Sequence, residues 1–362
     1  MAGTSKAGVF VGAGKPLEVQ EFPIPEVAPG SALIKMEMAA VCGTDVHATH
    51  NPSAPHPIIF GHENIGVIAD LGSELKYDVL GRPLKEGDRA IFRPAPCGRC
   101  YNCTIGNMCR VRPTYGLIPA DKPPYIQGGF SQYLYLGDDP WVVRVPDEMS
   151  TERALMAVIG NHTVMNGIDK IGGISVGETV VVQGSGPIGM GALNQAKVMG
   201  AKRVIVIGAP ADRLQLAEEM GADDTVSILE YETPEARIER IMELTDGNGP
   251  EVVIECSGAG SAVQEGLSMI RFGGRYLVVG QLTDYGDRPI NPSLITRKAV
   301  LLSGVVGSTY KYILRSMEAM NSVVKAPVEK LITHHFPLAE INEAFESHEN
   351  LEAMVAVMRP NL

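Results

Sequence analysis

Residues 179–189, which read TVVVQGSGPIG, decide the fold of this chain. Three consecutive valines are typical of a buried strand, and G-x-G-x-x-G follows directly, at the start of an expected helix. In such a turn the first glycine permits the bend, the second lets the backbone approach a pyrophosphate, and the third allows close helix–strand packing. The alternative is a tight connection without a ligand. We predict a dinucleotide site made by Gly184, Gly186, Pro187, Ile188 and Gly189.

The segments beyond this stretch alternate strands with helices. A second strand is expected at 204–207, a helix at 214–220 that Gly221 stops, and further strands at 252–254 and 276–279. Strands that alternate with helices predict a parallel, doubly wound sheet, and hence a Rossmann-type α/β domain.

The acidic residue that normally binds the adenosine ribose is missing from this pattern. It is expected about 20 residues after the turn, at the end of the second strand, where this chain has Gly208. Without a carboxylate the repulsion of a 2′-phosphate is absent, and Arg213 could pair with that phosphate. The alternative is that Asp212 or backbone groups bind the ribose, so the cofactor is NAD or NADP.

The first 150 residues have a different texture. Short apolar runs, such as 32–38 and 65–70, are separated by Gly and Pro, which is the pattern of an all-β unit. The tail from Ile332 mixes strand and helix, and we expect it to return to this first domain.

Four cysteines lie within thirteen residues of the β region. This number and spacing are those of a loop wrapped around a tetrahedral Zn²⁺ ion. Four protein ligands leave no open position, so this zinc would be structural. The predicted ligands are Cys97, Cys100, Cys103 and Cys109.

A second group combines three other donor types. Cys42 offers a thiolate, His62 an imidazole and Glu63 a carboxylate, all on turns between expected strands. Such a set with an open position is what a catalytic zinc requires. Singly, Cys42 and His62 would be buried core residues more often than ligands, but their joint presence beside a dinucleotide fold favours a metal site.

Composition narrows the class of partner. The chain has 362 residues, of which 31 are basic and 42 acidic, for a net charge of −11. An acidic surface argues against nucleic acid and anionic membranes as partners. The first six residues contain no apolar signal segment, so we expect a cytoplasmic protein in which six cysteines serve as ligands or isolated thiols rather than disulfides.

These motifs together resemble one family over nearly the whole chain: the zinc-dependent medium-chain dehydrogenase/reductases, which include alcohol, polyol and threonine dehydrogenases. The resemblance implies a GroES-like β domain with both zincs at 1–155 and 306–362, and a Rossmann NAD(P)-binding domain at 156–305. It also implies a homodimer or homotetramer. The matching residues are CGTDVH (42–47), FGHENIG (60–66), GDR (87–89), CGRC (97–100), GGF (128–130), VPD (145–147) and the turn from Gly184.

The same resemblance implies a reaction and roles. The chain is expected to transfer hydride between a small, secondary alcohol or ketone and NAD(P), with zinc as Lewis acid. Cys42, His62 and Glu63 look like ligands of the catalytic zinc. Thr44 looks like the hydroxyl that contacts the substrate oxygen, and His47 like the end of a proton relay. Thr163 looks like a nicotinamide contact.

One departure from the family pattern leaves alternatives open. The third zinc ligand should fall within 158–163, where no Cys, Asp or Glu occurs. Asn161, His162 or Glu63 could complete the site. Otherwise the chain could be a zinc-free quinone or alkene reductase of the same fold, although Cys42 and its partner residues speak against this. A non-catalytic dinucleotide-binding protein is a third, more distant reading.

Overall fold

The computed structural model describes residues 3–282, 286–322 and 326–362. The chain divides into two compact units, Met1–Val158 with Glu329–Leu362, and Ile159–Val328. The first unit contains both cysteine groups, and the second contains the glycine-rich turn.

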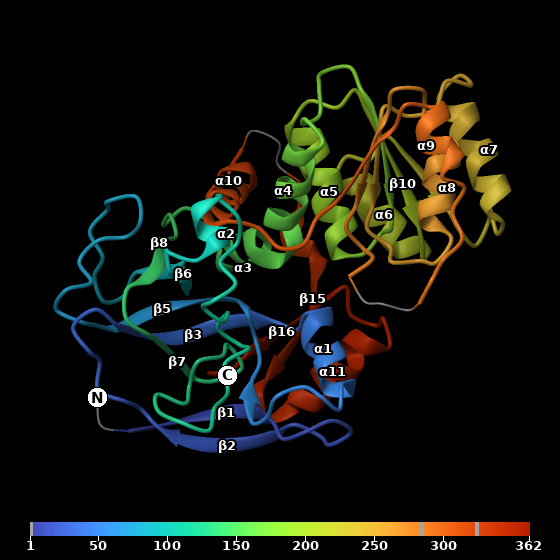
Figure 1. Cartoon of the computed structure of the whole chain (residues 1–362). Coiled ribbons are helices and arrows are strands. Elements are labelled where there is room, and N and C mark those ends of the chain that lie inside the picture. The colour runs from blue at the N-terminus through green and yellow to red at the C-terminus, as the bar shows by residue number, and fades with distance from the viewer. Residues whose placement is uncertain (1–2, 283–285, 323–325) are drawn as a thin grey trace. The chain divides into compact units, whose positions relative to one another are not determined.

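Two β-sheets form the first unit (Figure 1). The smaller has the order β2-β1-β4, and the larger has the order β15-β16-β3-β5-β6-β8, with β7 also paired to β3. The strands are β1 (Thr4–Phe10), β2 (Glu18–Pro23), β3 (Ala32–Ala40), β4 (Ile58–Ile59), β5 (Glu63–Leu71), β6 (Arg89–Pro94), β7 (Tyr133–Leu136), β8 (Pro140–Arg144), β15 (Ile332–Pro337) and β16 (Val355–Arg359). The helices are α1 (Gly43–His50), α2 (Tyr101–Thr104), α3 (Thr151–Met156), the short η3 (Leu338–Glu340) and α11 (Ile341–Glu349), and η2 (Val328–Leu331) leads into β15.

The C-terminal segment belongs to the core of this first unit. Strand β16 pairs antiparallel with β3, with Val357 opposite Ala40. On α11, the ring of Phe345 packs 6.3 Å from Phe60 and 5.8 Å from Phe130, centroid to centroid. Burial of such aromatic rings is a large apolar contribution, so the last 30 residues help to hold the sheets together.

The second unit is a six-stranded sheet in which every strand pair is parallel. Its order is β11-β10-β9-β12-β13-β14, with helices between the strands (Figure 1). This confirms the predicted doubly wound sheet. The strands are β9 (Thr179–Gln183), β10 (Arg203–Gly208), β11 (Asp224–Ser227), β12 (Val252–Glu255), β13 (Arg275–Val278) and β14 (Leu301–Gly304). The helices are η1 (Ala157–Asn161), α4 (His162–Lys170), α5 (Pro187–Val198), α6 (Ala211–Glu219), α7 (Pro234–Leu244), α8 (Ala262–Met269), α9 (Ser293–Arg297) and α10 (Tyr310–Met320).

The compact units differ from the predicted domain ranges at two places. Residues 156–158, which we expected in the second domain, cluster with the first unit. We expected the return to the first domain at residue 306, whereas the described residues 306–322 and 326–328 cluster with the second unit. The reason lies in α10, where the Tyr312 hydroxyl donates to Asp169 Oδ2 on α4 at 2.7 Å. The return begins at Glu329. The functional division into catalytic and cofactor domains stays a prediction.

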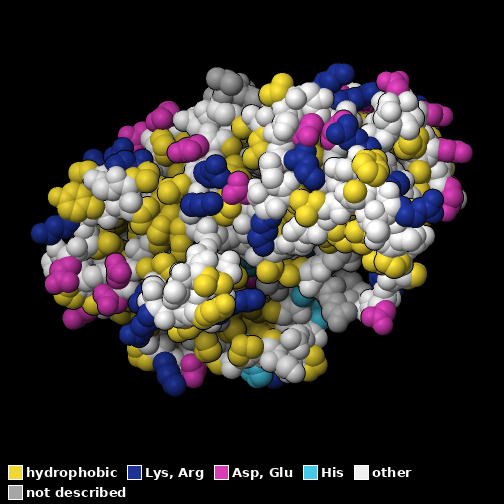
Figure 2. Space-filling view, turned by 45° about the horizontal axis from the view of Figure 1, so that its top comes forward, with side chains coloured by type: hydrophobic (Ala, Val, Ile, Leu, Met, Phe, Trp, Pro, Cys, Tyr) yellow, Lys and Arg dark blue, Asp and Glu magenta, His cyan; other side chains and the backbone are white. Residues whose placement is uncertain are grey.

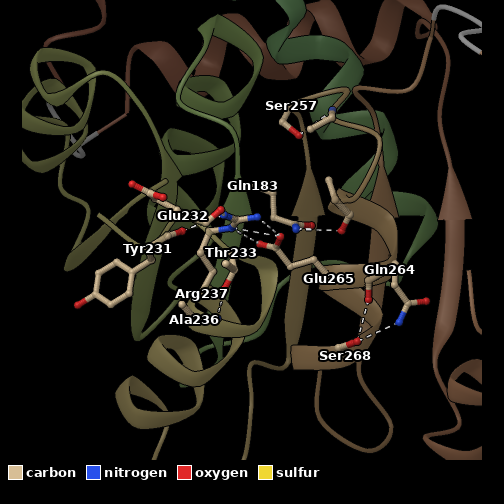
Figure 3. A network of polar contacts seen from close by, with 12 residues as sticks. Gln183, Tyr231, Glu232, Thr233, Ala236, Arg237, Ser257, Gln264, Glu265 and Ser268 are labelled. Carbon is tan, nitrogen blue, oxygen red and sulfur yellow. Dashed lines mark hydrogen bonds and ion pairs between the residues drawn. The ribbon is translucent and has the colours of Figure 1, made fainter. Parts of the chain in front are cut away.

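A buried ion pair fastens two helices of the second unit (Figure 3). Arg237 on α7 and Glu265 on α8 are 8% and 4% exposed. The guanidinium donates to both carboxylate oxygens, at 2.8–3.2 Å, and also to the carbonyls of Tyr231 and Glu232. All the charge of the pair is therefore matched by hydrogen bonds, which is what allows it to be buried.

Charges of both signs are mixed on the surface. On the face shown in Figure 2, the Lys and Arg side chains alternate with Asp and Glu side chains. Among the residues that the structure describes, no helix is long and apolar enough to span a membrane.

Candidate active site

The first zinc-type group begins at the turn between β3 and α1. Cys42 is in extended conformation at the N-cap of α1, and its N–H donates to Asp45 Oδ2 at 3.1 Å. Asp45 in turn donates its own N–H to the Cys42 carbonyl at 2.9 Å. This reciprocal pair fixes the helix start. It therefore fixes the position of the Cys42 thiol.

His62 is held by the same carboxylate. It lies between Gly61, whose φ is +91°, and the first residue of β5. Its Nδ1 is 3.2 Å from Asp45 Oδ1, the second oxygen of that fully buried side chain. One carboxylate thus orients both the thiol and the imidazole. Because Nδ1 faces the carboxylate, Nε2 is the nitrogen left for a metal.

Glu63 completes a three-donor cluster. One ligand atom each from Cys42, His62 and Glu63 lies within 4.8 Å of the others. Glu63 is 7% exposed, so its carboxylate is not a surface group. A thiolate, an imidazole and a carboxylate that converge in this way match the ligand types of zinc. The cluster fits the metal that the sequence predicts there.

The pKa values in this cluster reflect its crowding. The pKa of the Cys42 thiol is raised, first by burial and second by the nearby Glu63 carboxylate. Burial by itself lowers the pKa of His62, but Asp45 and Cys42 outweigh it and raise that pKa well above its usual range. Two carboxylates, those of Asp45 and Glu63, therefore lie close to the imidazole, and a bound cation would balance their charge.

Two predicted proton-transfer residues follow Cys42 on α1. The Thr44 hydroxyl lies 3.7 Å from the Cys42 sulfur, at the cluster. His47 is three residues further on and exposed. Residues three apart on a helix share a face, so Thr44 and His47 lie in line from the cluster toward solvent.

The four cysteines predicted to bind the structural zinc lie close together in the structure. Their sulfur atoms all lie within 4.8 Å of one another, including that of Cys109. Backbone N–H groups, first that of Cys97, lower the pKa of the Cys109 thiol to about 6. Burial, and after it the hydrogen bond with the Cys100 side chain, raises the pKa of the Cys103 thiol to about 12. Four thiols this close together can bind zinc as thiolates. A tetrahedral zinc ion would then take the place of their protons.

The glycine-rich turn has the geometry of a dinucleotide site. Gly184 has a φ of +116°, and a Cβ atom added to it would lie 3.0 Å from the Ser257 nitrogen, so only glycine fits. The space where a Cβ of Gly186 would lie is open. The other predicted cofactor residues lie as follows: Pro187, Ile188 and Gly189 in the first turn of α5, Gly208 at the end of β10, Arg213 in the first turn of α6, and Thr163 in the first turn of α4.

The two alternative zinc ligands lie in the second unit and have partners there. Asn161 is 1% exposed, and its Nδ2 donates to the Ile159 carbonyl at 3.4 Å. The Nδ1 of His162 is 2.7 Å from the Ser308 hydroxyl and 3.3 Å from that of Thr163. Within the first unit, the donors that converge with Cys42 are His62 and Glu63.

Sequence reasoning missed two acidic residues. Asp45 belongs to the CGTDVH motif (42–47), but the motif alone does not indicate its role. Glu255 ends β12 and is fully buried; its Oε1 accepts from the N–H groups of Ser257 and Gly258, each at 2.7 Å. The sequence contains one signal that could have identified Glu255, namely an acidic residue at the end of an apolar strand (252–255). Since β9 and β12 are neighbours at the point where strand order reverses, Glu255 ends its strand at the edge of the sheet where such folds bind dinucleotides.

Two family models match the chain. Residues 28–147 match the alcohol dehydrogenase GroES-like domain, and residues 187–322 match the zinc-binding dehydrogenase model. The chain is 33% identical over 346 residues to 5-exo-hydroxycamphor dehydrogenase of Pseudomonas putida, covering 94% of this chain and 95% of that protein. It is 33% identical over 344 residues to human sorbitol dehydrogenase, covering 91% and 89%. Its structure is similar to that of an alcohol dehydrogenase from Thermotoga maritima, with a TM-score of 0.92, 32% identity, and coverage of 99% and 100%.

The sheet topology, the two donor clusters and these matches define a zinc- and NAD(P)-dependent oxidoreductase that acts on CH–OH groups. The chain belongs to the zinc-dependent medium-chain alcohol dehydrogenases. The predicted GroES-like domain and the alcohol dehydrogenase function are confirmed, and the zinc-free reductase is not favoured.

Proposed function

We propose that Cys42, His62 and Glu63 hold the catalytic zinc of this dehydrogenase and that its substrates are small secondary alcohols and the corresponding ketones. The observation that carries the assignment is the convergence of the three ligand atoms within 4.8 Å. It needs no ligand from residues 158–163. Zinc at this place supplies Lewis acidity, which lowers the pKa of an alcohol.

Asp45 prepares the ligands for the metal. Its two oxygens face the Cys42 N–H and the His62 Nδ1. A carboxylate behind a ligating imidazole fixes the tautomer and the ring orientation. Asp45 therefore acts through His62 and not on the substrate.

Thr44 and His47 provide a route for the alcohol proton. The Thr44 hydroxyl is at the cluster and can both accept and donate a proton. His47 is exposed, and an imidazole exchanges protons with water near neutral pH. In the oxidation direction the proton passes from the substrate hydroxyl by way of Thr44 to His47 and solvent.

The turn after β9 binds the dinucleotide in this proposal. The open backbone at Gly186 lies at the N-terminus of α5, where the helix dipole favours a pyrophosphate. Pro187, Ile188 and Gly189 continue this turn. We assign Thr163 to the nicotinamide end, where NAD(P) takes up the hydride.

The four-cysteine loop holds a structural zinc. Cys97, Cys100, Cys103 and Cys109 supply four sulfur ligands and leave no position for substrate. The bound metal would stiffen a loop that contains only one short helix, α2.

The substrate class follows from the named relatives. Hydroxycamphor and sorbitol, after which two of them are named, are alcohols. We extend this to small secondary alcohols for the present chain. The proposal also includes a cytoplasmic location, supported by six free cysteines, and a homodimer or homotetramer, which sedimentation of the purified protein would test.

The test compares two histidine variants. NAD(P)H formation is measured with a panel of secondary alcohols for the wild type, His62→Ala and the control His334→Ala, which changes a half-buried histidine outside both donor clusters. We expect His62→Ala to lose about a thousandfold in kcat/KM, since the Lewis acid is lost, and His334→Ala to match the wild type. Full activity of His62→Ala would contradict the assignment, as would a wild type that reduces only quinones or activated alkenes.

A further inference from the structure

The end of β10 shows why this chain has no ribose-binding acid. Gly208 is buried at the point where β10 leaves the sheet. A Cβ atom at this position would overlap the Ser185 hydroxyl and would lie 2.5 Å from the Ser185 Cβ and 3.0 Å from the Ser185 nitrogen. A carboxylate side chain at 208 therefore requires Ser185 to move.

Ser185 is not free to move aside. Its hydroxyl donates to the Ala209 carbonyl at 2.9 Å and accepts from the Ala209 N–H at 3.1 Å. The side chain is 4% exposed. Two hydrogen bonds to one residue hold the hydroxyl against the backbone immediately after Gly208. Ser185, an unspecified position of the glycine-rich pattern, therefore enforces glycine at the strand end.

We infer that the adenosine end of the dinucleotide site accepts a 2′-phosphate, that NADP(H) binds more tightly than NAD(H) because residue 208 carries no acid, and that Ser185 keeps an acid out of that position. The inference rests on the proposed dinucleotide site and adds its choice of cofactor. An acid at 208 would accept hydrogen bonds from the ribose hydroxyls and repel a phosphate. With that acid excluded, neither effect operates.

The charges that follow β10 agree with this assignment. Arg213 is the one cation among residues 208–216, and it lies in the first turn of α6. A guanidinium matches a phosphate by two parallel hydrogen bonds. Asp212 is the one acid of the same segment; it is exposed, and its Oδ1 accepts the N–H of Arg213 at 2.9 Å, so that oxygen is engaged at the helix start.

Equilibrium binding tests the inference without turnover. The dissociation constants of NADPH and NADH are measured for the full-length protein from the fluorescence of the reduced nicotinamide. We expect NADPH to bind about tenfold more tightly or better, with that ratio lost in Arg213→Gln and kept in the control Arg240→Gln. Arg240 lies on α7, where it pairs with Glu243 at 2.9 Å.

A double variant tests the role of Ser185 itself. Ser185→Gly combined with Gly208→Asp makes room for the carboxylate, and we expect it to reverse the ratio so that NADH binds about tenfold more tightly. Ser185→Gly alone keeps the wild-type ratio, because it adds no acid.

Three results would overturn the inference. NADH binding as tightly as NADPH or more tightly in the wild type would show that another group, such as Asp212, serves the ribose. An unchanged ratio in the folded double variant would show that an acid at residue 208 does not decide between the two nucleotides. Binding of neither nucleotide would instead overturn the proposed dinucleotide site, and the inference with it.

Discussion

Asp45 Oδ1 lies 3.2 Å from His62 Nδ1, while the other oxygen of the same carboxylate accepts the Cys42 N–H at 3.1 Å. One fully buried side chain therefore connects two residues that are 20 positions apart in the sequence and that supply different metal donors.

This link predicts that Asp45 controls zinc affinity without touching zinc. Asp45→Asn keeps the shape but replaces one acceptor with a donor, which faces either the Cys42 N–H or the His62 ring. We expect the affinity of the cluster for zinc to fall about 10- to 100-fold. Competition with a chelator, followed by elemental analysis, measures it. The exposed Asp147→Asn serves as control, and equal zinc retention in both variants would contradict the role.

The four-cysteine loop is expected to depend on its metal. Cys103→Ala leaves three sulfur ligands, so the protein should retain one zinc less per subunit and unfold at a lower temperature. Elemental analysis and a thermal melt check this. Cys256→Ala, which removes a thiol outside both clusters, should keep the full zinc content. A Cys103→Ala protein with unchanged zinc would show that the loop does not bind metal through this residue.

The buried pair of Arg237 and Glu265 gives a stability prediction in the second unit. Glu265→Gln leaves the Arg237 charge buried without its counter-charge, and we expect a loss of about 3–5 kcal/mol in the free energy of unfolding. Urea unfolding followed by circular dichroism measures it. The paired change Arg237→Met with Glu265→Leu should recover most of this loss, because it removes both charges. If the single variant is as stable as the wild type, the pair does not hold α7 to α8.

Acid stability should depend on Asp78 in the first unit. Burial tends to raise the pKa of Asp78, but Arg82 and the N–H groups of Arg82, Arg144 and Leu80 lower it below the usual value. Because the folded pKa is below the unfolded one, this stabilisation is complete above about pH 4 and is lost as the pH falls through the folded pKa. We expect Asp78→Asn to cost about 1–3 kcal/mol at pH 7.

The pH dependence distinguishes this effect from simple repacking. Unfolding free energies of the wild type and Asp78→Asn should converge as the pH is lowered below 4, since the wild-type carboxylate then becomes neutral. A difference that stays constant from pH 7 to pH 3 would mean that charge is not involved.

Much of the fold was predictable because local patterns carry it. The valines of 180–182 and the glycine turn after them specify strand, turn and helix within eleven residues. The strands expected at 204–207 and 252–254 appear as β10 (Arg203–Gly208) and β12 (Val252–Glu255). Local patterns could not show that α10 belongs to the second unit, because α10 contacts α4 through two residues that are 143 positions apart.

The site was predictable as residue types but not as an arrangement. Spacing pointed to Cys42, His62 and Glu63, yet it left open whether Asn161 or His162 completes the site. Only the fold shows that Asn161 packs beside Gly191 within the second unit. The effect of Ser185 on Gly208 depends on atoms of two residues 23 positions apart, and no sequence pattern expresses it.

Zinc per subunit, measured by elemental analysis on freshly purified protein that has not met a chelator, tests the central claim most directly. The account predicts two equivalents in the wild type and one in Cys42→Ala, which keeps the four-cysteine loop intact. One equivalent in the wild type, unchanged by Cys42→Ala, would mean that Cys42, His62 and Glu63 do not hold zinc, and it would contradict the account.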